Sequence, residues 1–354
     1  MTTYYCDPDA TGDDDGTTQA NAWTTLQRAI DGTDGTKPTA GDTVLLKHGN
    51  DADPTEADEV IAAAIDMDGN SGTAGVPVRF IGVNQSWAEQ DGIYYVVNGN
   101  GNTINGIVLV SDYTEVANIK VHSCDSTSGF GFGQGSYINY SDYCKLRNIW
   151  VHDCNGASGT THGFNLDYTR YLMAYRCKAT NNRSNGFLYG TAAGGMVYVG
   201  CVASSNSGKG FMSYAASLVG CLAFSNTGVG FESYYGPNSY VNCIANANSG
   251  HGLQALGTHS VSVFGCRFTN HSQAGKYGIY GETAGNQLHI KGCYLGNNTN
   301  SGVYGYYLDL GDNTLDGSDT NEAGGGYGGY VNASTYDFNL KTTATGRSVA
   351  MTLP

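Results

Sequence analysis

Cysteine recurs at nearly regular intervals through the centre of this 354-residue chain. Successive cysteines from Cys154 to Cys293 are separated by 23, 24, 20, 22, 23 and 27 residues. From Cys177 onward, each is followed nine or twelve residues later by Gly and a large apolar residue. Self-similarity at such a period is typical of a solenoid, in which each repeat contacts only its neighbours.

The residues around each cysteine alternate in polarity with a period of two. Positions two before and two after the cysteine are apolar in every repeat, with Lys291 as the one exception. They are Tyr175, Val199, Val219, Val241 and Phe264 before it, and Ala179, Ala203, Ala223, Ala245, Phe268 and Leu295 after it. This alternation predicts short strands with one buried face. The chain is therefore expected to be all-β, a right-handed parallel β-helix whose coils stack at about 4.8 Å.

The recurring cysteine is interpreted as an interior position, because cysteine is readily buried and packs as a small hydrophobe. Five residues after it comes an asparagine, replaced once by His271; the asparagines are Asn182, Asn206, Asn226, Asn248 and Asn298. Asparagine tolerates left-handed backbone angles and can bond its own backbone. A stacked turn at each asparagine is therefore predicted.

Composition narrows the classes of partner. The formal net charge is −14, and 15 of the acidic residues lie between Met1 and Asn70. Such a surface repels phosphate backbones, so no nucleic-acid partner is expected. No apolar run is long enough to span a membrane, and the opening residues lack a signal-peptide pattern. The ten cysteines form no CxxC pair, which favours free thiols and folding in a reducing cytoplasm.

The two ends of the chain differ from the repeats. A short amphipathic helix is predicted from Ala20 to Ile30, with Thr18 or Asn21 as its N-cap, covering the open end of the coils. The chain is divided into an N-terminal strand and capping helix over 1–40, β-helix coils over 41–310 and a C-terminal closure over 311–354. A solenoid needs such caps because its terminal coils expose apolar side chains and strand edges.

An acidic loop near the N-terminus could hold calcium through Asp13, Asp14 and Asp15. Their spacing does not match an EF-hand, and such loops are more often only turns. Calcium is the one cofactor considered, and the expectation favours none.

Several segments resemble the pectate-lyase-like right-handed β-helix superfamily. They are Tyr4–Asp9, Trp23–Ile30, Gly41–Val44, the Asn-Gly-Phe turn at 185–187 and Asp337–Leu340. The resemblance spans nearly the whole chain and implies the fold. It implies no single activity, because the superfamily includes polysaccharide lyases, hydrolases, epimerases, and tailspikes and other virion proteins of bacteriophages.

Lyases of this superfamily use Arg or Lys as the base, usually with calcium held by acidic residues. Between Tyr168 and Leu308 the only acids are Glu232 and Glu282, so the central coils show no carboxylate pair. An earlier cluster places His162, Asp167, Arg170 and Arg176 within one coil, to which the preceding coils could add Asp125 and Asp153. As a lyase site, Arg170 would be the base, with Asp167 and Asp153 as anchors for metal or substrate. The favoured alternative is that these are ordinary surface charges and turn residues.

Tyrosines follow several of the Gly-apolar strands: Tyr189, Tyr214, Tyr234, Tyr280 and Tyr304. They are predicted to form an exposed aromatic strip. Aromatic rings stack on sugars, but tyrosine is also a routine strand residue. Glycan binding and packing both remain open for this strip.

The favoured function is a non-catalytic virion-surface protein of a bacteriophage, either a capsid decoration protein or a tailspike-like adhesin. Its expected partners are other virion proteins, surface glycans and, by resemblance alone, two further copies in a homotrimer. It would fold in the host cytoplasm and reside on the virion. The alternative is a polysaccharide lyase acting on an acidic glycan.

Overall fold

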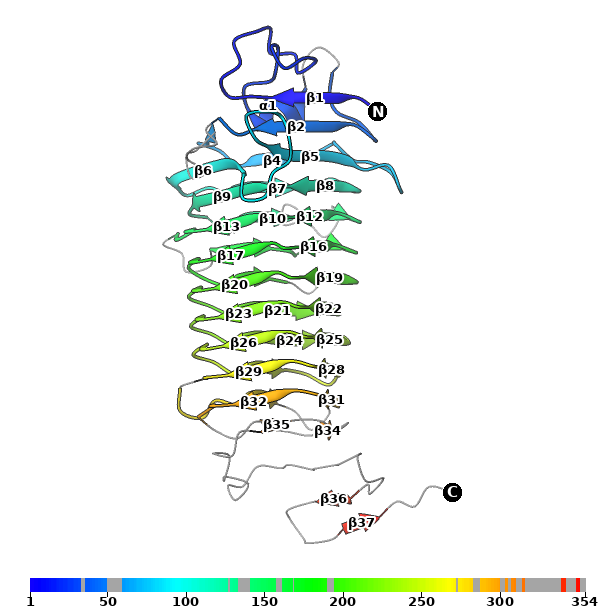
Figure 1. The fold of residues 1–354 in the computed structure, drawn as a ribbon, viewed down its shortest axis with the longest axis vertical. Helices are drawn as coiled ribbons and strands as arrows, with labels where there is room; N and C mark the ends of the chain where they lie inside the picture. Colours follow the sequence, from blue (N-terminus) through cyan, green and yellow to red (C-terminus); the bar gives the residue numbers. More distant parts are fainter. Residues whose placement is uncertain are drawn as a thin grey trace. The chain divides into compact units, whose positions relative to one another are not determined.

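The computed structural model divides the chain into two compact units, Met1–Met196 (unit 1) and Val197–Pro354 (unit 2), which are described separately. Figure 1 shows the labelled helix and strands along the chain. The described residues are 1–32, 36–49, 59–126, 128–132, 141–156, 161–167, 169–189, 194–271, 273–282, 287–299, 303–304, 307–309, 314–315, 339–341 and 348–350.

Unit 1 is built from three parallel sheets, and from β2 onward each coil contributes one strand to each sheet. Sheet A1 contains β1 (Thr3–Cys6), β2 (Thr43–Lys47), β5 (Val78–Val83), β8 (Thr114–Ala117), β12 (Lys145–Arg147) and β16 (Met173–Tyr175). Sheet B1 contains β3 (Glu59–Val60), β6 (Tyr95–Asn102), β9 (Ile119–Cys124), β13 (Trp150–His152) and β17 (Lys178–Thr180). Sheet C1 contains β4 (Ile65–Met67), β7 (Ile107–Leu109), β10 (Ser128–Phe132), β14 (His162–Asn165) and β18 (Phe187–Leu188). A small parallel pair, β11 (Ser141–Asp142) and β15 (Thr169–Arg170), precedes the A1 strands.

Unit 2 repeats this arrangement, and β19 (Met196–Val199) spans the boundary between the units. Sheet A2 contains β22 (Ala216–Val219), β25 (Asn238–Val241), β28 (Ser260–Phe264), β31 (Gln287–Lys291) and β34 (Tyr307–Asp309). Sheet B2 contains β20 (Val202–Ser204), β23 (Leu222–Phe224), β26 (Ile244–Asn246), β29 (Arg267–Thr269), β32 (Tyr294–Gly296) and β35 (Thr314–Leu315). Sheet C2 contains β21 (Phe211–Tyr214), β24 (Phe231–Tyr235), β27 (Leu253–Ala255), β30 (Ile279–Gly281) and β33 (Val303–Tyr304). The predicted all-β parallel β-helix is confirmed.

The cysteine column lies in the interior, as predicted. All ten cysteines are buried and none forms a disulfide. In unit 2 the Cys221 thiol donates to the carbonyl oxygen of Val219 at 3.7 Å and lies 3.6 Å from that of Tyr198 in the preceding coil. The backbone N–H of Cys243 donates to the sulfur of Cys266 at 3.4 Å. The thiols therefore follow one another from coil to coil.

The asparagines form an interior hydrogen-bond ladder, and their predicted left-handed turn is wrong by one residue. Positive φ angles of 54° to 60° occur at the residue before each ladder position: Asn181, Ser205, Ser225, Ala247, Asn270 and Asn297. The preceding residue turns the chain, so the asparagine amide can point inward. Asn226 accepts from the backbone N–H and the amide of Asn206 at 3.0 and 2.9 Å, and donates to Asn248 at 2.9 Å. The ladder gives hydrogen-bond partners to buried backbone groups that do not pair within the parallel sheets.

The N-terminal helix, α1 (Leu26–Asp31), is shorter than predicted. Thr25 is its N-cap and accepts from the Arg28 N–H at 3.1 Å, so neither Thr18 nor Asn21 caps it. The helix starts late because Trp23 forms a parallel bridge with Cys6 and the Thr24 N–H donates to Asp14 at 2.8 Å. Its covering role stays a prediction.

The predicted C-terminal closure falls almost entirely outside the described residues. Of 311–354, the structure describes β35 and an antiparallel pair, β36 (Asn339–Lys341) and β37 (Ser348–Ala350). Within the described residues, no helix has the length and hydropathy needed to cross a membrane. The proposed divisions at residues 40 and 310 stay predictions.

Asn226→Ala should lower the free energy of unfolding by about 1–3 kcal/mol, because it leaves buried groups of Asn206 and Ala203 without their partner. Urea denaturation monitored by circular dichroism measures this change. The matched control is Thr227→Ala, one position further in the same turn and exposed, for which we expect a change within about 0.5 kcal/mol. Equal losses in both variants would show that the ladder adds no specific stability.

Candidate functional site

A three-residue pattern recurs just before three successive strands of sheet A1. It reads Ser111-Asp112-Tyr113, Ser141-Asp142-Tyr143 and Thr169-Arg170-Tyr171. The three hydroxyl side chains are fully buried or nearly so, and each donates to a carbonyl oxygen of the preceding coil. These hydrogen bonds join Ser111 to Met67 (2.6 Å), Ser141 to Leu109 (2.8 Å) and Thr169 to Ser141 (2.5 Å). The first residue of each pattern thus fixes the position of the tyrosine that follows two residues later.

The middle residues of the pattern link the coils on the outside. The backbone N–H of Asp142 donates to the Asp112 carboxylate at 2.7 Å. Arg170 donates from Nε to Oδ1 of Asp142 at 3.0 Å, and its Nη2 pairs with Oδ2. Such a two-point contact holds a guanidinium in one orientation.

The three tyrosines stack on one another. Tyr113, Tyr143 and Tyr171 have φ angles of 48°, 56° and 56°, which turn their side chains out of the coil. The ring centroids are 4.9 and 4.7 Å apart, with interplanar angles of 6° and 11°. Tyr143 is 49% exposed and Tyr171 53%, which places them among the most exposed large hydrophobic side chains of the described residues. We call these three residues the tyrosine stack.

A glycine supports the last ring of the stack. Gly195 has φ +70°, and a Cβ atom added there would lie 2.8 Å from Cδ1 of Tyr171. Any larger residue would push this ring aside. The position of the Tyr171 ring therefore depends on glycine at 195.

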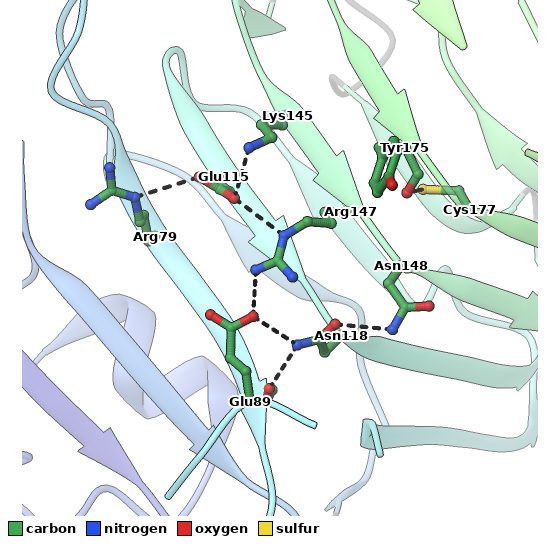
Figure 2. A network of polar contacts seen from close by, with 10 residues as sticks. Arg79, Glu89, Glu115, Asn118, Lys145, Arg147, Asn148, Tyr175 and Cys177 are labelled. Carbon is green, nitrogen blue, oxygen red and sulfur yellow. Dashed lines mark hydrogen bonds and ion pairs between the residues drawn. The ribbon is translucent and has the colours of Figure 1, made fainter. Parts of the chain in front are cut away.

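A cluster of charges covers the outer face of sheet A1 (Figure 2). Glu115 of β8 lies between neighbours in the register, Arg79 of β5 and Lys145 of β12. Its carboxylate is 3.5 Å from Arg79 Nε, 3.2 Å from Lys145 Nζ and 3.6 Å from Arg147 Nε. Arg147 also pairs with Glu89 at 2.7 Å. The cluster has one more positive charge than negative, although the chain carries −14.

Two asparagines connect this cluster to the outer face of sheet B1 (Figure 2). The Asn148 amide donates to Asn118 Oδ1 at 3.0 Å, and the Asn118 amide donates to the carbonyl of Gly82 at 3.1 Å. Asn148 Oδ1 also accepts from the Tyr94 hydroxyl at 3.0 Å. The Tyr94 ring meets the indole of Trp150 edge to face, with centroids 6.1 Å apart.

Trp150 lies between two lysines of the neighbouring coils. Lys120 Nζ is 4.8 Å and Lys178 Nζ is 5.6 Å from the ring centroid, and both residues are register partners of Trp150. Each ammonium group is attracted to the face of the indole ring, and the ring keeps the two positive charges apart. The outer faces of A1 and B1 thus combine aromatic rings with basic side chains. Such a surface can contact the C–H faces of sugars and bind carboxylate or sulfate groups.

The four predicted catalytic residues lie in different turns of the coil. The side chains of three of them have partners of their own, whereas within the described residues Oδ1 of Asp167 is buried without a hydrogen-bond partner. Asp153 follows β13 and accepts from His152 Nδ1 at 2.6 Å. His162 begins β14, accepts from the Asn185 N–H at 3.3 Å, and burial lowers its pKa to about 4. Burial raises the pKa of Asp167, and Arg170 is held by Asp142. The strand β14 separates Asp153 from Arg170 along the coil, and their catalytic roles stay a prediction.

The predicted calcium loop uses its carboxylates for internal contacts. Asp15 accepts from the Thr17 N–H at 2.8 Å, Asp14 pairs with Arg28 at 3.0 Å, and Asp13 lies 3.5 Å from the Asn21 amide. In the part of the chain that the structure describes, no three His, Cys, Asp or Glu side chains gather as they would around a metal ion. Calcium binding by these three carboxylates stays a prediction.

The predicted tyrosine strip is wrong at Tyr189, which is only 1% exposed. Tyr189 stands two residues after the buried Phe187 and therefore shares its inward face, whereas Tyr214 stands three after the buried Phe211 and faces outward. Tyr214 and Tyr234 each lie against Tyr235, with ring centroids 5.8 and 4.8 Å apart. Tyr280 and Tyr304 stack at 4.9 Å on sheet C2.

The sequence prediction missed the tyrosine stack of unit 1. Its signal was the Ser/Thr-charged-Tyr pattern, which recurs after 30 and 28 residues. These intervals are longer than those of the cysteine series, so the pattern was not recognised as part of the same repeat.

Glu115→Gln should lower the free energy of unfolding by about 1–2 kcal/mol, between the values of exposed and buried ion pairs, because three cations lose their shared partner. Its carboxylate is 12% exposed, whereas that of the matched control Glu89→Gln is 46% exposed. For the control we expect a loss of at most about 1 kcal/mol. Urea denaturation at low and high salt measures both, and a Glu115 variant as stable as the control would contradict the central role of Glu115.

Comparisons with known proteins identify the fold of this chain but no family to which it belongs. No protein-family model and no curated protein matches the sequence. Solved structures do match: a rhamnogalacturonan lyase is 16% identical with a TM-score of 0.55, over 87% of this chain and 81% of that chain. The A-module of the Azotobacter vinelandii mannuronan C-5 epimerase AlgE4 is 13% identical, with a TM-score of 0.56 over 86% and 81% of the two chains. The Dettilon tailspike protein is 12% identical, with a TM-score of 0.54 over 88% and 67%. The chain therefore has the parallel β-helix fold of these structures, as its sequence predicts.

Proposed function

We propose that the protein binds glycans through the tyrosine stack and the adjoining outer face of sheet A1. The single observation that carries this proposal is the exposure of stacked rings, 49% at Tyr143 and 53% at Tyr171. Exposed aromatic side chains held in a fixed orientation lose little conformational freedom on binding, which favours affinity.

The tyrosine hydroxyls supply polar contacts beside the rings. Partial loss of water around the hydroxyl raises the pKa of Tyr143 above its ordinary value, and the adjacent Tyr171 and Tyr113 raise it further. The phenol is therefore neutral at physiological pH and can both donate and accept hydrogen bonds. A sugar presents the same two features, apolar C–H faces and hydroxyl groups.

Successive tyrosine rings are separated by one coil, so a linear glycan that runs along the coil axis meets the same group repeatedly. Lys145, Arg147 and Arg79 follow on the same sheet and would bind acidic substituents of such a chain.

The contacts of Arg170 favour a protein that binds glycans without cleaving them. Its guanidinium is engaged by two points of the Asp142 carboxylate. An arginine stays protonated in proteins, and an ion pair strengthens this preference, which makes it a poor proton acceptor.

We further propose that the chain acts at the surface of a bacteriophage virion, as a tailspike-like adhesin or a capsid decoration protein. The similarity in fold to the Dettilon tailspike protein supports this assignment. Assembly as a homotrimer with other virion proteins, after folding in the host cytoplasm, belongs to the same proposal. Co-sedimentation of the protein with assembled particles tests it, and a protein that never accompanies particles would exclude the virion assignment.

Tyr143→Ala and Tyr171→Ala should each weaken glycan binding roughly tenfold, because each removes an exposed ring worth about 0.5–1.5 kcal/mol in addition to its contact area. A glycan array that includes acidic and neutral polymers identifies the ligand, and titration calorimetry measures the affinity. The matched control is Tyr235→Ala in unit 2, where the side chain is 48% exposed. Unchanged affinity in both stack variants, or an equal loss in the control, would refute this site.

A polysaccharide lyase remains the second candidate, with Arg170, Asp167 and Asp153 as its site. Incubation with uronate polymers and calcium, followed by the absorbance of unsaturated product, tests it directly. We expect no turnover. Turnover that Arg170→Ala abolishes and Arg267→Ala leaves intact would replace the binding proposal with the lyase.

A further inference from the structure

Unit 2 exposes two rows of apolar side chains where sheets A2 and B2 meet. The first row faces outward from sheet A2 and β19, and the second faces outward from sheet B2. They consist of Val199, Val219, Val241 and Phe264, and of Val202, Leu222 and Ile244. Val219 and Ile244 are each 38% exposed, and the other five are partly exposed. We call these seven residues the apolar ridge.

The corner between the two rows holds glycine in three of its four coils and Asn242 in the fourth. Gly200, Gly220 and Gly265 occupy it with φ angles of 60° or 61°. A Cβ atom added at Gly220 would meet nothing within 4 Å, so the space outside it is open. The corner lets another backbone approach the ridge closely.

The same positions of the coil have a different chemistry in unit 1. There the positions equivalent to the first row hold Ala117, Arg147 and Tyr175, those equivalent to the second row hold Lys120, Trp150 and Lys178, and the corner holds Asn118, Asn148 or Arg176. The β-helix fold thus accepts charged side chains at these positions. Contiguous exposed apolar side chains in unit 2 therefore indicate a surface that is covered by another molecule.

The chemistry of the ridge suits a copy of itself. Beside it, a column of serines faces outward from sheet A2 at Ser217, Ser239 and Ser262, and hydroxyl groups can both donate and accept. From Val199 to Phe264 the outward positions of the A2 and B2 strands hold no charged residue. In a chain with a net charge of −14, two copies that meet at these positions bring no like charges together.

We propose that the apolar ridge is the surface through which copies of this chain associate. This inference rests on the self-association included in the proposed function and names its contact surface. It is independent of glycan binding, because the ridge lies in unit 2 and the tyrosine stack lies in unit 1. Apolar rows from both copies would bury each other, and the bare glycine corners would allow the coils to come close together.

Sedimentation equilibrium of the purified full chain over a wide range of concentrations tests the proposal. We expect the wild-type protein to self-associate. Val219→Lys and Ile244→Lys, one from each row, should raise the dissociation constant at least roughly 100-fold, because each places an unpaired charge in the interface. Tyr235→Lys is the matched control, with a similarly exposed side chain outside the ridge, and should leave association unchanged.

Circular dichroism and the inaccessibility of the ten buried thiols to reagent show that each variant is folded. A wild-type protein that stays monomeric at every concentration would overturn the proposal, as would folded lysine variants that associate as strongly as the wild type. Loss of glycan binding with association intact would count against the tyrosine stack alone, so the two proposals fail separately.

Discussion

Parallel stacking of coils is the constraint on which the rest of this structure depends. Because the strands of successive coils pair in register, each interior side chain lies directly against its equivalent one coil away. Such a position needs a residue that packs against itself. Cysteine does so as a small apolar group, and asparagine does so because its amide both donates and accepts. The ladder through Asn206, Asn226 and Asn248 shows the second case, since each amide bonds to the next.

The same constraint acts on the outer surface with a different result. Aromatic rings can stack on their equivalents, as Tyr113, Tyr143 and Tyr171 do. Like charges at one coil spacing repel, so the charged column alternates from Arg79 to Glu115 to Lys145. In the neighbouring column, Trp150 separates Lys120 from Lys178. The stacking of equivalent positions thus favours an outer surface on which aromatic rings stack and cations are separated by acidic or aromatic side chains.

Much of the fold could be predicted from the sequence because interior positions repeat. The cysteine series and its apolar neighbours identified the strands, and the buried thiols confirm the interior column. The turn at the asparagines was misplaced by one residue because several residue types accept the left-handed angle there, including Ala247. Tyr189 was misassigned because successive residues of a strand point to opposite faces, so an error of one residue in its position reverses the predicted face. The charged cluster could not be predicted, since Glu89 reaches Arg147 from 58 positions away, outside any repeat.

A solenoid also separates folding from surface chemistry more cleanly than a globular domain does. Each coil contacts only its neighbours, so outward side chains can change from coil to coil while the interior columns stay constant. Unit 1 and unit 2 illustrate this at one corner of the coil, with Arg147 and Lys120 in one and Val219 and Ile244 in the other. An outward substitution that leaves the asparagine ladder, the thiols and the ion pairs of Glu115 undisturbed therefore reports on binding or association rather than on stability. This is why the tyrosine stack and the apolar ridge can each be assigned a role by mutations that do not unfold the coils beneath them.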